Sequence, residues 1–94
     1  MKVSVNVPWF TFLFADSVTF AKIREAVASL GLADLGNFTP VEVFRGGSVP
    51  PGQHSILLRA RFQSRERTLR EDEVAESSAK IVSSLQALGG TQRA

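Results

Sequence analysis

The segment SILLRARFQ, residues 55–63, decides the fold. Its even-numbered positions are all apolar, while its odd-numbered positions include two arginines: Ile56, Leu58, Ala60 and Phe62 alternate with Leu57, Arg59 and Arg61. Successive side chains of a β-strand point to opposite faces of a sheet. The pattern therefore predicts a strand with one face in the core and a basic face turned away from it.

Upstream of this strand, the sequence predicts a second strand and a connecting loop. Residues 46–52 contain three glycines and two prolines, which oppose regular structure and indicate the loop. Residues 39–44 precede it and are expected to form the strand, with Gly36 and Asn37 as a break before its start. Alternation separates its side chains into two pairs: Val41 and Val43 on one face, Glu42 and Phe44 on the other.

Downstream, the sequence predicts a helix followed by a short strand. Thr68 and Glu71 match the T-x-x-E capping box that opens helices, and acids in the first turn favour the positive end of the helix dipole. The apolar stripe of this helix follows helical spacing: Val74, Ser78, Ile81, Val82, Leu85 and Leu88. Gly89 and Gly90 then stop the helix, which leaves residues 91–93 for a final strand.

The N-terminal part of the chain predicts one more strand and one more helix. Residues 7–15 are rich in aromatic side chains and are expected to form the strand. Its two faces are Phe10, Phe12 and Phe14, and Trp9, Thr11 and Leu13. Thr19 can cap a helix with apolar positions at helical spacing (Phe20, Ile23, Val27 and Leu30), and Gly31 is expected to end it.

The predicted order is therefore β-α-β-β-α-β. This order is typical of an α+β, ferredoxin-like fold, in which two helices cover one face of a four-stranded antiparallel sheet. Ninety-four residues suffice for one domain with a modest core, so we expect a single domain over residues 1–94. Because two helices can cover only one face, the other face of the sheet is expected to be open.

Composition and charge narrow the class of partner. The chain is 44% hydrophobic and has no Cys, which excludes disulfides and thiolate metal sites and suits a reducing, cytoplasmic setting. No apolar run approaches the roughly 20 residues that cross a bilayer, so we expect no membrane partner. Six of the eleven basic residues are arginines between positions 45 and 70, against one acid, Glu66. Such a local excess of positive charge favours a polyanionic partner.

The expected open face carries aromatic and basic side chains together. It includes Trp9, Phe44, Arg59 and Arg61, with Glu42 among them. Aromatic rings stack on unpaired bases, and arginine binds phosphates or stacks through its guanidinium. Aromatic side chains also dominate protein interfaces, so a face that docks on a neighbouring domain or on a second copy is the alternative.

Nothing in the sequence indicates a reaction. His54 is the only histidine and has no acid close to it in the sequence, so a surface or turn position is expected rather than a catalytic or metal site. The loop at residues 46–48 lacks the Lys-Ser/Thr pair of a phosphate-binding loop. The acids at residues 71–76 are better explained by the helix dipole than by acid–base chemistry.

Several motifs follow one another at characteristic spacing. Residues 41–47 read VEVFRGG, residues 49–59 read VPPGQHSILLR and residues 63–69 read QSRERTL. These stretches resemble, in the same order, the F-D-V-Y-x-G, I-P-x-G-x-x-S-L-A-x-R and Q-S-x-D-R-T-L motifs of the ferredoxin-fold anticodon-binding domain. That domain forms the C-terminus of the phenylalanyl-tRNA synthetase beta subunit. The tail GGTQR, residues 89–93, is similar to its G-A-x-L-R ending.

The resemblance implies candidate site residues by position. Phe44 stands where the family has tyrosine and Glu42 where it has aspartate, while Arg59 coincides with a family arginine and Arg67-Thr68 with its R-T pair. These positions and the expected open face together give the residues predicted to contact RNA: Trp9, Glu42, Phe44, Arg45, Arg59 and Arg61. The residues expected to shape turns and the start of the last helix are Gly46, Pro50, Gly52, Arg67 and Thr68.

The resemblance also implies a function and its partners. We expect a non-catalytic module, without a cofactor, that grips the anticodon stem-loop of phenylalanine tRNA and supports an aminoacyl-tRNA synthetase in protein biosynthesis. Other synthetase domains and the alpha subunit are the implied protein partners. An excised C-terminal domain fits best, although the initial Met also allows a free-standing protein. A protein-binding or self-associating module of the same fold is the alternative.

Overall fold

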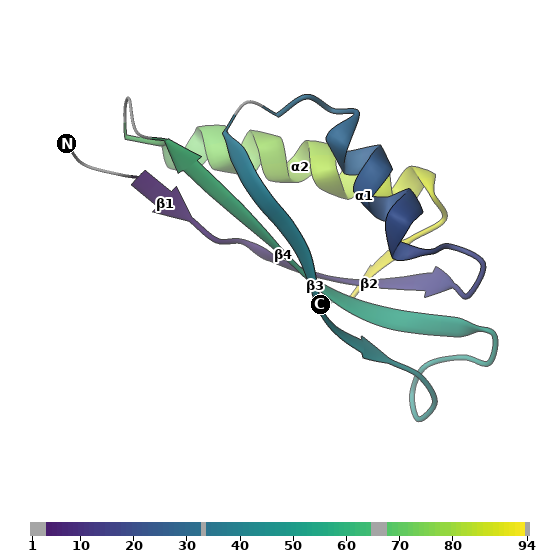
Figure 1. Ribbon diagram of the computed structural model, residues 1–94. Helices are drawn as coiled ribbons and strands as arrows, with labels where there is room; N and C mark the ends of the chain where they lie inside the picture. The colour runs from purple at the N-terminus through teal and green to yellow at the C-terminus, as the bar shows by residue number, and fades with distance from the viewer. Residues whose placement is uncertain (1–3, 33, 65–67, 94) are drawn as a thin grey trace.

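The computed structural model describes residues 4–32, 34–64 and 68–93. Its elements follow the order β-α-β-β-α-β, with the first strand divided in two (Figure 1). They are β1 Ser4–Asn6, β2 Trp9–Ala15, α1 Phe20–Ala28, β3 Leu35–Phe44, β4 Gln53–Ser64, α2 Glu71–Ala87 and β5 Thr91–Arg93. Pro8 lies between β1 and β2, where its missing N–H interrupts the ladder. Its carbonyl still accepts a hydrogen bond from the Ala60 N–H at 3.1 Å.

The strand that the alternating segment predicted, β4, lies at the centre of the sheet. β3 pairs along one edge of it, while β1 and β2 pair with successive parts of the other edge. β5 then pairs with β2, which gives the spatial order β3-β4-β2-β5 with all pairs antiparallel. This is the predicted α+β, ferredoxin-like topology.

Both helices lie on the same side of the sheet (Figure 1). Beneath them, the even-numbered side chains of β2 and β4 form the core with residues of both helices: Phe10, Phe12, Phe14, Ile23, Val27, Ile56, Leu58, Ala60, Phe62, Leu69, Ile81 and Leu85. Removal of this apolar surface from water is the main term that stabilises the fold. Neither helix of the described residues lies over the opposite face of the sheet.

The two helix starts differ. Thr19 caps α1 as predicted, since its hydroxyl accepts from the Lys22 N–H at 3.4 Å. The predicted capping box at Thr68 is wrong, because α2 begins at Glu71 and Arg70 occupies the N-cap without a side-chain cap. Glu71 is therefore the first helical residue, whereas a capping box requires the acid at the third. Arg67 lies outside the described residues.

β3 is longer than the sequence predicted. Gly36 and Asn37 belong to this strand rather than to a break before it. The ladder instead shifts register twice, between Leu35 and Asn37 and between Pro40 and Glu42. Both irregularities are typical of an edge strand. Gly36 can adopt the backbone conformation of a bulge, and Pro40, which has no backbone N–H, can face the unpaired side of the strand.

Within the described residues, neither helix is long and apolar enough to cross a membrane.

Candidate nucleic-acid interface

The register of the sheet places the predicted side chains on the open face in rows. In one row, Trp9 lies opposite Arg59, and Arg59 lies opposite Thr39 on its other side. The next two rows along the strands are Arg93, Thr11, Leu57 and Glu42, and then Thr91, Leu13, Ser55 and Phe44. Directly paired residues share a face of the sheet, and rows on the same face recur every second residue.

The two aromatic side chains of this face are accessible. Trp9 is 52% exposed and Phe44 is 51% exposed. They lie two rows apart, with Glu42 next to Phe44 along β3. Large apolar side chains at this exposure leave ring surface free for a partner. The structure therefore brings Trp9, Glu42, Phe44, Arg59 and Arg61 together on one accessible surface, which we call the open face.

Cations on this face are held close to their neighbours. The guanidinium carbon of Arg59 lies 5.8 Å from the centre of the Trp9 ring, which is cation–π geometry. Arg61 donates from Nε to Oε1 of Gln63 at 3.3 Å. Arg59 therefore places a planar cation beside the Trp9 ring, and Arg61 places a second one further along the same strand.

Arg93 is a third arginine on the open face, at a position that the sequence did not predict to contact RNA. Its backbone pairs with Thr11, which places it in the same row as Glu42. Only three residues form β5, too few to show an alternation that assigns a face. The signal that could have found it is the expected antiparallel pairing of the last strand with the first.

The loop between β3 and β4 closes one end of the open face. Arg93 donates to the Ser48 hydroxyl of this loop at 3.4 Å. Ser55, which shares its row with Phe44 on the otherwise open face, is only 2% exposed. Val49 of the loop is buried although it does not belong to the core under the helices. The loop thus folds over this end, while the part around Trp9 stays uncovered.

The loop takes its shape from glycines. Gly46 and Gly52 both have a φ of 79°. Residues with a side chain rarely adopt this backbone conformation, whereas glycine adopts it readily. The Val49 N–H donates to the Gly46 carbonyl, and the Gln53 N–H donates to the Pro50 carbonyl. Gly46 and Gly52 thus supply the two backbone positions of this loop with a φ of 79°.

Arg45 directly follows Phe44 in the chain, but its side chain contacts a residue outside the open face. Its Nε is 3.6 Å from Oδ1 of Asp16, which follows β2. The same oxygen accepts a hydrogen bond from Nδ1 of His54 at 3.1 Å. The expectation of a surface histidine is wrong, because His54 is buried and lies beside the Phe14 ring. Asp16 is 38 residues away in the sequence, so local inspection could not identify it as the partner.

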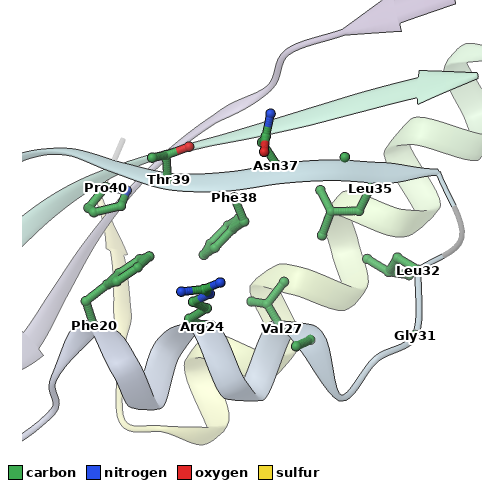
Figure 2. A pocket seen from close by; sticks show the side chains of 12 residues that line it. Phe20, Arg24, Val27, Gly31, Leu32, Leu35, Asn37, Phe38, Thr39 and Pro40 are labelled. Carbon is green, nitrogen blue, oxygen red and sulfur yellow. The ribbon is translucent and has the colours of Figure 1, made fainter.

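A second surface feature lies between α1 and the free edge of β3 (Figure 2). It is a groove of about 490 Å³ lined by Phe20, Arg24, Val27, Leu32, Leu35 and Phe38, among others. The Phe20 and Phe38 rings are nearly parallel, with centres 6.5 Å apart. Arg24 extends from α1 between the two walls (Figure 2). None of the residues predicted to contact RNA lines this groove.

Comparison with known proteins decides the family. The model of the ferredoxin-fold anticodon binding domain matches residues 10–93, nearly the whole chain. This chain belongs to the ferredoxin-fold anticodon binding domain family. The family is a non-catalytic part of a synthetase beta subunit, so the expectation that this chain is not itself an enzyme is confirmed.

Three curated relatives of this chain are phenylalanine–tRNA ligase beta subunits. The phenylalanine–tRNA ligase beta subunit of Geobacter sulfurreducens is 37% identical over 82 residues, which cover 86% of this chain and 10% of the relative. The beta subunits of Ruegeria pomeroyi and Syntrophotalea carbinolica are 33% and 30% identical, covering 89% and 86% of this chain and 11% and 10% of the relatives. This chain thus spans about a tenth of the length of the relatives it matches.

Proposed function

We propose that this chain binds the anticodon stem-loop of phenylalanine tRNA through its open face. The observation that carries the proposal is the pair of half-exposed rings, Trp9 and Phe44, on one sheet face with Arg59. Membership in a family of anticodon-binding domains supports an RNA ligand. The relatives are phenylalanine–tRNA ligase beta subunits, which supports phenylalanine tRNA as the particular ligand.

The chemistry of the face suits unpaired nucleotides. A base has two flat surfaces and stacks on an aromatic ring for about 1–3 kcal/mol. Trp9 and Phe44 each offer such a ring, and only unpaired bases can reach them. The arginines of the face can pair with the phosphates of the same nucleotides. A continuous duplex keeps its bases stacked and so cannot use the rings.

Glu42 gives the face a way to select bases. It lies next to Phe44 along β3, directly opposite Leu57, so a base stacked on Phe44 would have an edge near its carboxylate. A carboxylate repels phosphates and accepts hydrogen bonds from base N–H groups. The base edge, rather than the backbone, is therefore the part of the nucleotide that we assign to Glu42.

The proposal extends to the setting of the domain. We infer that it works beside other synthetase domains and the alpha subunit of a cytoplasmic phenylalanine–tRNA ligase, whose other parts carry out catalysis. Support comes from the relatives, which are beta subunits about ten times as long as the matched segment. Because few arginines face the ligand, the isolated chain should bind weakly and with a clear dependence on salt.

Trp9 provides the assay. It is the only tryptophan, so its fluorescence reports directly on the open face. The chain is titrated at low salt with the phenylalanine anticodon stem-loop, and separately with a fully paired RNA duplex of similar length. We expect the stem-loop to quench Trp9 and saturate at lower concentration than the duplex. Equal binding of both RNAs, or no change with either, would argue against the proposal.

Self-association through the open face is the second candidate. Val5, Trp9 and Phe44 are all exposed, and Val5 pairs with Gln63 on the same edge of β4 that Trp9 occupies. An apolar stripe of this kind can also dock on protein. Sedimentation over a range of concentrations, followed with Trp9 fluorescence, separates the two. A concentration-dependent dimer that buries Trp9 would favour this candidate over RNA.

A further inference from the structure

In the part of the chain that the structure describes, no residue from 39 to 48, the stretch of the β3–β4 hairpin that carries Phe44, belongs to the core under the helices. Every residue from 39 to 48 is exposed. Val43 lies opposite Ile56, on the side of the sheet that bears the helices, yet it is 49% exposed. The hairpin extends past the two helices (Figure 1), and its ladder shifts register between Pro40 and Glu42. Its position therefore depends on its pairing with β4, on the buried Val49 near its tip and on a small number of polar contacts.

Asp16 contacts the start of β4 and both ends of the loop that joins β3 to it. Its N–H donates to the Gly52 carbonyl at 2.9 Å. Its Oδ1 accepts from His54 Nδ1 at 3.1 Å, at the start of β4. The same oxygen lies 3.6 Å from Arg45 Nε, directly after β3. One carboxylate at the end of β2 thus joins the end of β3 to the start of β4.

The two side-chain partners of Asp16 have different roles. His54 is 6% exposed, and its ring centre lies 6.3 Å from that of Phe14, so it gives the carboxylate a fixed partner tied to the core. Arg45 is mostly exposed but directly follows Phe44 in the chain. An ion pair that restrains Arg45 also restrains the backbone that orients the Phe44 ring. Arg45 and Asp16 are both exposed, so their ion pair is a weak restraint by itself, and the buried His54 fixes the carboxylate that Arg45 meets.

We propose that Asp16 is a positioning residue: through His54 and Arg45 it holds the β3–β4 hairpin so that the Phe44 ring faces the ligand. This proposal rests on the proposed function, because the ring's role in stacking belongs to it. Asp16 itself lies beyond the end of β2 and takes no part in the rows of the open face. Arg45 accordingly acts on the hairpin, and we assign it no direct RNA contact.

Four variants separate the contacts. Asp16→Ala removes both side-chain partners, whereas Asp16→Asn keeps an oxygen that can accept from His54 and loses the ion pair with Arg45. Arg45→Gln removes the ion pair from the other side. Glu25→Gln is the matched control, because it removes one negative charge from the exposed surface of α1, away from the hairpin.

Hydrogen exchange of the intact chain, without RNA, measures the hairpin directly. We expect Asp16→Ala to speed exchange of the amides in residues 42–55 by about tenfold relative to those of β2, with a smaller effect for Asp16→Asn and Arg45→Gln. Glu25→Gln should leave the ratio unchanged. Equal acceleration of hairpin and β2 amides, or none, would overturn the positioning role.

A double-variant cycle then tests whether Asp16 acts through Phe44. With the anticodon stem-loop as probe, Asp16→Ala should weaken binding several-fold in the native background and have no further effect in a Phe44→Ala background. Equal losses in both backgrounds would contradict action through this ring. If the native chain does not bind the stem-loop, the proposed function and the stacking step fail together, while the exchange data still decide whether Asp16 holds the hairpin.

Discussion

Arg59 and Trp9 face each other across the centre of the open face, directly paired on adjacent strands, with the guanidinium carbon 5.8 Å from the centre of the indole ring. This arrangement keeps a permanent positive charge next to a ring that is half exposed. A nucleotide stacked on Trp9 would have its phosphate within the field of Arg59. The pair is therefore the simplest unit of the proposed site, and the first to test.

Substitution of Arg59 should weaken binding of the anticodon stem-loop. We expect Arg59→Ala to raise the dissociation constant by about tenfold, and Arg59→Lys to raise it less, because lysine keeps the charge but loses the planar group. Fluorescence titration through Trp9 measures both variants. Arg24→Ala is the control, since that arginine lies in the groove between α1 and β3. A loss of affinity as large for Arg24→Ala as for Arg59→Ala would contradict the assignment.

Salt dependence counts the phosphates that the face engages. If Arg59, Arg61 and Arg93 each bind one phosphate of an unpaired strand, the slope of log K against log salt should be roughly −2. Arg61→Gln and Arg93→Gln should each make it shallower by about 0.7. Titrations at four salt concentrations give the slopes. Unchanged slopes in both variants would show that these two arginines do not contact phosphate.

The two threonines near helix starts should differ in their effect on stability. Thr19→Ala removes the cap of α1 and should lower the free energy of unfolding by about 1 kcal/mol. Thr68→Ala should change it by less than about 0.5 kcal/mol, because Thr68 is exposed and lies two residues before the N-cap of α2. Urea unfolding measures both. The opposite ranking would mean that Thr68 does cap α2.

Gly90 is expected to tolerate no side chain. A Cβ at this position would lie 2.6 Å from Phe14 Cε1 and 2.8 Å from the Leu85 carbonyl oxygen. Gly90→Ala should therefore lower the free energy of unfolding by about 2 kcal/mol, within the range for overpacked cores. Gly36→Ala is the matched substitution, because its Cβ would meet only the Arg61 carbonyl at 3.5 Å. Thermal unfolding that ranks Gly36→Ala as the more damaging of the two would refute this packing.

The fold followed from the sequence wherever alternation or helical spacing was long. Residues 56–62 of β4 alternate over several positions, and the structure buries the predicted side while exposing Arg59 and Arg61. Local sequence motifs gave wrong predictions where a strand is irregular and where a helix begins. Gly36 suggested a break, yet β3 absorbs it as a bulge, and Thr68 matched a capping motif that is out of phase with the helix.

Only part of the candidate RNA site, the rows of the open face that contain Trp9 and Arg59, could be predicted from the sequence. Alternation placed Trp9 and Arg59 on the same face, since β2 and β4 have seven and twelve residues, enough to show it. The short β5 concealed Arg93, and the Asp16–His54 contact joins residues 38 positions apart. Tertiary contacts of this kind depend on which strands pair in the folded sheet, and a short stretch of sequence does not determine this pairing.

The central claim is that RNA binds on the open face, and backbone NMR tests it most directly. The ¹⁵N-labelled chain is titrated with the phenylalanine anticodon stem-loop, and amide shifts are mapped onto the sheet. We expect the largest changes at Trp9, Thr11, Glu42, Phe44 and Arg59, with little change in α2. Changes concentrated on the helices or along the groove between α1 and β3 would contradict it.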